Sequence, residues 1–87
     1  MKDNQALKRY ELQVDGYIAY ANYRLDKGVI NIDYVFAPPE LRGSGAAGKL
    51  MAEIVKMAQE RGVKIHPICG YAVAWLKKHD EFEGLVA

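Results

Sequence analysis

Hydrophobic and polar residues alternate along the first third of the chain. This period of two is typical of half-buried β-strands and predicts strands at 9–14, 17–24 and 29–36. Asp15-Gly16 separates the first two strands, and residues 25–28 separate the second and third. Asp and Gly favour such turns because they tolerate a positive φ. The three strands should therefore form an antiparallel meander. On the third strand, one face is expected to carry Ile30, Ile32, Tyr34 and Phe36.

The period changes after Pro38-Pro39, which ends the third strand because proline cannot donate to a sheet. Apolar residues recur at helical spacing from 44 to 61, and Gly62 is a natural C-terminal cap. A short strand at 63–68 and a second helix at 71–79 follow, with Leu85 and Val86 as a final strand or a tail. The expected order is β-β-β-α-β-α. This is an α+β fold with a helix packed on a mostly antiparallel sheet.

Composition limits the function classes. The chain has 87 residues, enough for one domain spanning 1–87 with one modest core. Its net charge is +1 and it has no basic run, which argues against nucleic-acid binding. No apolar run has the length of a membrane span. The single cysteine and two histidines have no metal-ligand spacing, and a lone cysteine favours a reducing, cytoplasmic setting.

The loop that precedes the first expected helix fits three phosphate-binding patterns. Gly43, Gly45 and Gly48 match the dinucleotide fingerprint, but four residues separate them from the strand, and the next strand ends without an acid for the ribose. Gly43, Gly48 and Lys49 match a P-loop, but Leu50 stands where Ser or Thr should bind magnesium. The third pattern is the Arg-Gly-Ser-Gly turn at 42–45, which suits the pyrophosphate of coenzyme A.

Physical chemistry supports the third pattern. Glycines let the backbone approach a ligand without Cβ clashes, and the N–H groups at a helix N-terminus attract anions. Arg42 can add a positive charge. The alternative is a glycine-rich helix start that binds nothing.

The stretch APPELRGSGAAGKLMAEIV resembles motif A of the GNAT superfamily of N-acetyltransferases. The superfamily pattern Gln/Arg-x-x-Gly-x-Gly/Ala maps onto residues 40–45, with Glu40 in the first position. Almost the whole chain is similar to a subgroup of very small GNAT-like proteins. The similarity runs from the opening hairpin to an ending in which a strand closes on Pro-x-Cys at 67–69 and a helix leads into His79-Asp80-Glu81-Phe82. Two features depart from the pattern. Tyr34-Val35 stands where the subgroup often has His-Thr. Full-size members of the superfamily have helices between their first two strands that shape an acceptor pocket, and the short Asp15-Gly16 turn leaves no room for them here.

The resemblance implies that acetyl-CoA binds where the third strand splays from the strand at 63–68. The pantetheine arm would bond to the backbone near Val35, Phe36 and Ala37. The pyrophosphate would lie on the loop and the helix start, and the last helix would flank the cofactor. The loop positions implied are Arg42, Gly43, Ser44, Gly45, Ala46 and Ala47.

Two residues are candidates for the chemistry. Cys69 lies between a strand and a helix, where a thiol can become nucleophilic, although free cysteine is often a small buried side chain. Tyr71 lies near the position at which many GNAT enzymes place the acid that protonates the leaving thiolate. Its alternative is a core aromatic. His66 and His79 are interpreted as structural residues.

The sequence therefore predicts an N-acetyltransferase that moves acetyl from acetyl-CoA, a small-molecule acyl donor, to an unidentified amine acceptor. It predicts no metal, nucleic-acid or membrane partner. The alternative is a non-catalytic coenzyme A-binding or protein-interaction module, favoured by the missing acceptor helices and the lack of a clear base. The small core and an exposed sheet edge are compatible with a homodimer.

Overall fold

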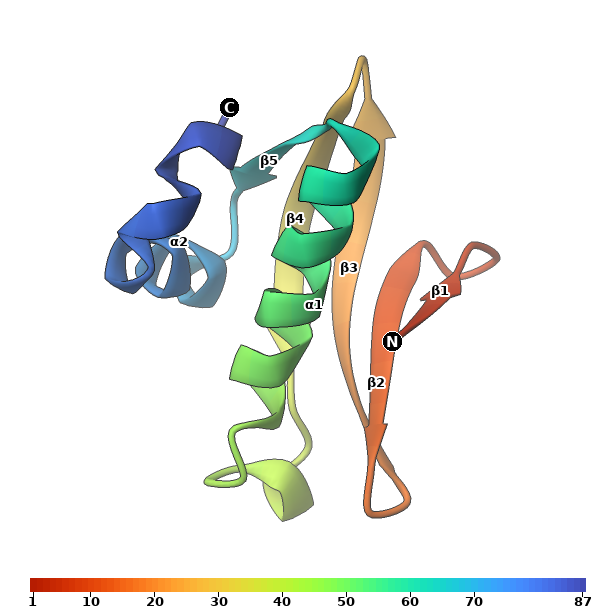
Figure 1. Cartoon of the computed structure of the whole chain (residues 1–87). Coiled ribbons are helices and arrows are strands. Elements are labelled where there is room, and N and C mark those ends of the chain that lie inside the picture. The colour runs from red at the N-terminus through yellow and green to blue at the C-terminus, as the bar shows by residue number, and fades with distance from the viewer.

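The computed structural model describes residues 1–87 as one five-stranded sheet with two α-helices (Figure 1). The strands are β1 (Lys2–Asn4), β2 (Arg9–Val14), β3 (Tyr17–Asp26), β4 (Val29–Phe36) and β5 (Lys64–Pro67). The helices are α1 (Ala46–Arg61) and α2 (Gly70–Lys78), and two short 3-10 helices are η1 (Pro39–Leu41) and η2 (Asp80–Leu85). The α+β class and the expected order are confirmed, with one additional strand at the start.

The sheet is mixed, and its spatial order follows the chain from β1 to β5. The first four strands are antiparallel neighbours, whereas β4 and β5 are parallel because α1 connects them. The additional strand β1 consists of polar residues, so the alternation of hydrophobic and polar positions does not predict it. Strand β1 is held by its pairing with β2 and by a hydrogen bond of 2.5 Å that the Tyr23 hydroxyl donates to Asp3, the middle residue of β1.

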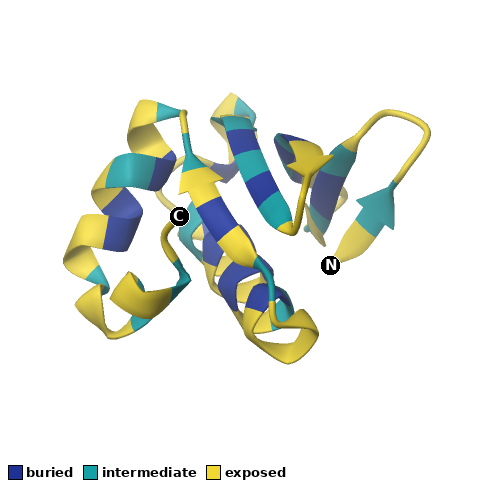
Figure 2. Ribbon diagram, turned by 90° about the horizontal axis from the view of Figure 1, so that it is seen from above, coloured by how far each residue is buried: buried dark blue, intermediate teal, exposed yellow.

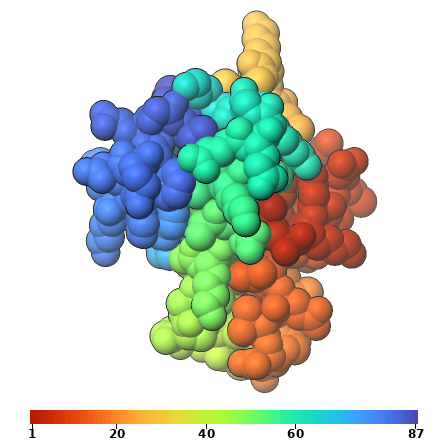
Figure 3. All heavy atoms as spheres, in the orientation of Figure 1, coloured from red at the N-terminus to blue at the C-terminus, as the bar shows by residue number.

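Helix α1 packs across one face of the sheet, and the core lies between them. Figure 2 shows the buried positions alternating along the strands and gathering on one side of α1. The core side chains of α1 are Ala46, Leu50, Met51, Ile54, Val55 and Ala58. Helix α2 lies beside α1 and contributes Ala72, Trp75 and Leu76. The space-filling view shows this helical face, with the β3–β4 hairpin projecting from one end (Figure 3).

The prediction that Ile30, Ile32, Tyr34 and Phe36 share one face is wrong. The register between β3 and β4 shifts at Asn22/Tyr23, so that Asp33 is an extra residue on β4. Ile30 and Ile32 are buried beneath α1, whereas Tyr34 is 49% exposed. A β-bulge of this kind reverses which residues face the core. As a result, the Tyr34 and Phe36 rings lie together on the opposite face.

The C-terminal segment forms η2 and then a single bridge to β5, between Ile65 and Val86. The N–H of Ala87 donates to the carbonyl of Ile65 at 2.8 Å. Leu85 therefore ends a 3-10 helix, and Val86 makes the only strand-like contact of this segment. No helix in the structure combines the length and apolar character needed to cross a membrane.

Two tyrosines stack inside the core. The ring centroids of Tyr10 and Tyr23 are 4.1 Å apart. The Tyr10 hydroxyl is buried with no hydrogen-bond partner, while that of Tyr23 reaches Asp3. Burial, reinforced by the Asp3 carboxylate, raises the pKa of Tyr10 to about 12. The two rings pack against each other, but only the Tyr23 hydroxyl has a hydrogen-bond partner.

Candidate functional site

The site begins where β4 and β5 separate. The two strands pair only from Val29↔Lys64 to Ile32↔Pro67, and β4 then continues to Phe36 paired with β3 alone. The Ile32 carbonyl accepts hydrogen bonds from the N–H groups of Ile68 and Cys69, which turn the chain into α2. Beyond Ile32, no strand lies along this edge of β4. The sheet is therefore split at the end nearest the N-terminus of α1.

A cavity of about 480 Å³ lies beside the split. This volume falls within the range of about 300–1,000 Å³ typical of small-molecule sites. Its walls come from the end of β4, the loop before α1, the first turn of α1, and α2. The lining residues are Tyr34–Ala37, Leu41–Gly43, Gly45–Gly48 and Tyr71.

The loop reaches the cavity in a conformation that requires glycine. Gly43 and Gly45 have φ values of 88° and 80°, in the left-handed region that is strained for other residues. Ser44 stabilises the turn from inside, since its hydroxyl donates to the Leu41 carbonyl and accepts the Ala46 N–H at 3.3 Å. Helix α1 then begins at Ala46, two residues later than the pattern predicts.

Four backbone N–H groups at this turn have no hydrogen-bond partner in the protein. They belong to Gly43, Gly45, Ala47 and Gly48, and all four residues line the cavity. The next amide, that of Lys49, starts the helical ladder by donating to Gly45 at 2.9 Å. Unpaired N–H groups at a helix N-terminus, together with the helix dipole, bind anions such as phosphate.

Arg42 adds a positive charge at the rim of the cavity. Its Nε donates a hydrogen bond of 3.3 Å to the carbonyl of Ala37, and the side chain is exposed. This bond holds the guanidinium between the end of β4 and the loop. No carboxylate is among the lining residues, so the cavity combines free N–H groups with a cation and no opposing negative charge.

Tyr71 forms the wall contributed by α2. A Cβ built on Gly48 would lie 3.6 Å from the Tyr71 hydroxyl, which places this hydroxyl beside the first turn of α1. Burial raises the pKa of Tyr71 above its usual value. The phenol therefore keeps its proton at neutral pH and can donate it into the cavity.

Cys69 is placed differently. It is the N-cap residue of α2, and its half-buried side chain packs against the core rather than lining the cavity. The structure thus brings Tyr71, but not Cys69, to the cavity wall. The nucleophilic role of Cys69 stays a prediction.

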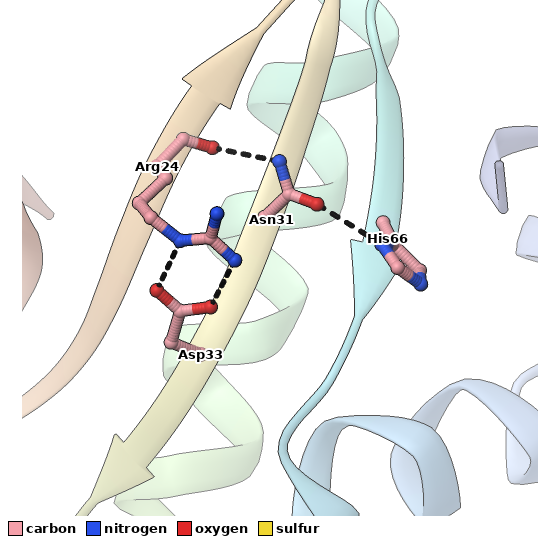
Figure 4. Close-up of polar contacts among 4 residues, drawn as sticks. All are labelled: Arg24, Asn31, Asp33 and His66. Atoms are coloured by element: carbon pink, nitrogen blue, oxygen red, sulfur yellow. Dashed lines mark hydrogen bonds and ion pairs between the residues drawn. The ribbon is translucent and has the colours of Figure 1, made fainter.

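The histidines lie outside the cavity. His66 is on the open face of the sheet, where its Nδ1 is 3.0 Å from Asn31 Oδ1 (Figure 4). Asn31 in turn donates to the Arg24 carbonyl, and Arg24 pairs with Asp33 through two hydrogen bonds. His79 stacks on Trp75 with ring centroids 3.8 Å apart. These contacts support the structural interpretation of both histidines.

The cavity gathers most of the positions that the sequence singles out. Val35, Phe36, Ala37, Arg42, Gly43, Gly45, Ala46 and Ala47 all line it together with Tyr71. Ser44 does not line the cavity; its hydroxyl bonds to the backbone of Leu41 and Ala46 and so stabilises the turn. The sequence reasoning missed Tyr34, Leu41 and Gly48. Of these, Gly48 carried a signal, because it is the last glycine of the G-x-G-x-x-G pattern.

Comparison with known proteins identifies the family. The family model for GCN5-related N-acetyl-transferase matches residues 9–85, which include the split sheet, the loop and both helices. The chain belongs to the GCN5-related N-acetyltransferase family. No curated protein matches it significantly. The structure is similar to the NMR solution structure of a GCN5-like protein from Staphylococcus aureus, with a TM-score of 0.69 and 27% identity over 92% of this chain and 89% of that one.

Family membership gives the cavity a chemical context. The GCN5-related N-acetyltransferase family implies the use of an acyl-CoA as the acyl donor. Coenzyme A carries phosphates and a long, mostly neutral arm. The site offers an N–H-lined anion receptor and an open strand edge side by side, so the residues present fit such a molecule.

Proposed function

We propose that this protein transfers an acetyl group from acetyl-CoA to a primary amine. The observation that carries this proposal is the set of four unpaired N–H groups at Gly43, Gly45, Ala47 and Gly48. All four residues line a cavity that continues to the free edge of β4. An anion receptor next to an open strand edge suits a ligand with a pyrophosphate at one end and an amide-containing arm at the other.

In this proposal the whole of 1–87 is one acyl-CoA-binding domain. The pyrophosphate binds the N–H groups of the loop and the first turn of α1, with Arg42 supplying a cation. The pantetheine arm follows β4 along Val35 to Ala37, where no strand competes for the backbone. The thioester then lies towards the point where β4 and β5 part, near Tyr71.

The chemistry is an aminolysis of the thioester. The neutral amine nitrogen attacks the carbonyl carbon, so that a C–N bond forms and the C–S bond breaks. The proton lost by nitrogen passes to solvent. Tyr71 gives its hydroxyl proton to the leaving thiolate and is reprotonated from water. The place of Tyr71 in the cavity wall supports this role. Burial raises its pKa, which keeps the phenol protonated at neutral pH but also makes it a weaker acid.

A covalent route through Cys69 makes a different prediction. Its thiolate would first take the acetyl group, releasing coenzyme A before any amine reacts. Mixing enzyme and acetyl-CoA without an amine would then give one equivalent of acetylated Cys69, visible as a mass increase of the protein. Without that product, and with full turnover in Cys69→Ala, transfer is direct.

One observation favours a second function. The titratable residues lining the cavity are Tyr34, Arg42 and Tyr71, and none of them is a ready base for an ammonium proton. A protein that binds acyl-CoA without transferring its acyl group would have the same anion receptor. The alternative is therefore a non-catalytic coenzyme A-binding module.

The test separates the two functions. Melting curves with and without acetyl-CoA report binding, and release of free coenzyme A thiol in the presence of amines reports transfer. The proposal predicts a higher midpoint and amine-dependent thiol release that Tyr71→Phe slows by about 100-fold or more. A raised midpoint with no thiol release from a broad amine panel would support the binding module. An unchanged midpoint would exclude both.

A further inference from the structure

Three aromatic rings form a continuous patch on the sheet face that α1 does not cover. Phe36 lies between the other two, with its ring centroid 5.2 Å from that of Tyr20 and 6.3 Å from that of Tyr34. The β-bulge at Asp33 places Tyr34 and Phe36 on this face. We call these three residues the aromatic platform. Tyr34 is its most exposed member, since 49% of the residue is accessible.

The platform is continuous with the cavity. Tyr34 and Phe36 are themselves lining residues, and they lie on β4 next to the place where the two strands part. A molecule resting on their rings would therefore be beside the end of the cavity that the proposed thioester reaches. The platform approaches this point from the sheet face opposite α1, while the acyl donor is held by the N-terminus of α1.

A cation already sits on one ring of the platform. The Arg9 guanidinium carbon is 4.5 Å from the centroid of the Tyr20 ring, a cation–π contact. The rings of Tyr34 and Phe36 have no such partner. They offer flat, electron-rich faces to another cation or to another aromatic ring.

The charged side chains around the platform are already paired. Glu11 lies opposite Tyr20 in the sheet and accepts a hydrogen bond of 2.6 Å from Arg9 Nε. Asp33 precedes Tyr34 and is held by Arg24 (Figure 4). Neither carboxylate is left to receive a second ammonium group of a substrate. Arg9 and Arg24 are therefore not left to receive a substrate carboxylate, and the proposed function assigns Arg42, at the cavity rim, to the pyrophosphate.

We propose that the aromatic platform is the acceptor site and that it selects primary amines with one positive charge and an aromatic or apolar body, of the arylalkylamine class. The rings attract the ammonium group and pack against the body, while the paired side chains provide no partner for further ionic groups. The bound ammonium loses one proton to solvent before the neutral nitrogen attacks the thioester. The inference rests on the proposed acetyl transfer and assigns its second substrate.

The experiment measures kcat/KM by thiol release with four amines that differ in their ring, carboxylate or number of charges. The probes are 2-phenylethylamine, ethylamine, phenylalanine and spermidine. We expect 2-phenylethylamine to exceed ethylamine, which lacks the ring, by about tenfold or more. Phenylalanine adds a carboxylate to the phenylethylamine skeleton, and spermidine lacks the ring and adds charges, so both should also be poorer acceptors than 2-phenylethylamine.

A matched pair of variants places this preference on the platform. Tyr34→Leu should lower kcat/KM for 2-phenylethylamine about 2- to 12-fold more than for ethylamine, because both amines lose the cation–π contact but only 2-phenylethylamine loses an aromatic pair. Tyr17→Leu is the control, because Tyr17 is comparably exposed at 44% and belongs neither to the platform nor to the cavity lining. It should leave both values unchanged.

Each contrary result points to a different failure. The platform is not the acceptor site if ethylamine, phenylalanine or spermidine is used as well as 2-phenylethylamine or better. The same holds if Tyr34→Leu leaves the preference unchanged. Neither result contradicts acetyl transfer itself. Binding of acetyl-CoA with no turnover on any of the four amines also overturns the platform as an acceptor site. If acetyl-CoA does not bind at all, the proposed function is wrong, and the acceptor role of the platform is wrong as well.

Discussion

Replacing Ala47 by proline would delete one N–H from the proposed anion receptor while keeping the loop. Ala47 is the second residue of α1, and its N–H makes no hydrogen bond within the protein. Proline is tolerated in the first helical turn because no helical hydrogen bond is lost there. The change therefore removes a group that matters for the ligand and little that matters for the fold.

The expected loss of affinity follows from the charge of the ligand. A hydrogen bond to a charged group is worth about 1.5–3 kcal/mol, which corresponds to a Kd about 10- to 150-fold higher. At an acetyl-CoA concentration about 100 times the original Kd, binding adds about 2.7 kcal/mol to stability, and the variant would keep only about 0.3–1.4 kcal/mol. Since each kcal/mol moves the midpoint of a small domain by about 4–8 °C, melting curves resolve this difference.

Ala47→Val is the matched control, because valine is similar in size to proline and keeps the N–H. It should retain most of the midpoint shift caused by acetyl-CoA. If Ala47→Val loses as much of the shift as Ala47→Pro, the loss is steric and the reasoning from unpaired N–H groups is refuted. A full shift in Ala47→Pro would refute it equally.

Other predictions concern Tyr71, the proposed general acid, and the two core tyrosines. Tyr71→Phe should lower kcat about 100-fold or more with acetyl-CoA binding retained, as measured by thiol release and melting. Tyr10→Phe should raise stability by about 1 kcal/mol, because it removes a buried hydroxyl without a partner. Tyr23→Phe should instead cost about 1.5–3 kcal/mol by breaking the bond to Asp3; urea unfolding of both variants checks the opposite signs. The pKa of Tyr10 is about 12 in the folded protein and about 10 when unfolded, so the folded state holds the proton more tightly. The contribution of Tyr10 to stability should therefore be complete below about pH 10 and be lost, by about 2–3 kcal/mol, towards pH 12. Tyr23, whose pKa is raised by burial and by Asp3, adds to the loss in the same direction, so Tyr10→Phe should remove only part of it.

The sequence predicts the parts of this fold that depend on local patterns. Alternation identifies β2, β3 and β4, helical spacing identifies α1, and Gly62 marks its end with φ of 68°. The glycines of the loop also point to the cavity, because a positive φ at Gly43 and Gly45 is a local requirement. Such features follow from a few adjacent residues.

Features that depend on contacts between residues far apart in the sequence cannot be predicted from the local pattern of hydrophobic and polar positions. Strand β1 is polar and exists because it pairs with β2 and because Asp3 meets Tyr23. The bulge at Asp33 depends on the register between two strands, and it moves Tyr34 and Phe36 to the open face. Whether Cys69 or Tyr71 faces the cavity depends on how α2 rotates against α1. Two residues separate them in sequence, but only the packing decides which one lines the wall.

The central claim is that unpaired backbone N–H groups at the start of α1 hold the acyl donor. An NMR titration of ¹⁵N-labelled protein with acetyl-CoA tests it directly, because each amide reports its own environment. The account predicts that the largest amide shifts occur at Gly43, Gly45, Ala47 and Gly48, with smaller shifts along the end of β4. Largest shifts elsewhere, or none at saturating acetyl-CoA, would contradict it.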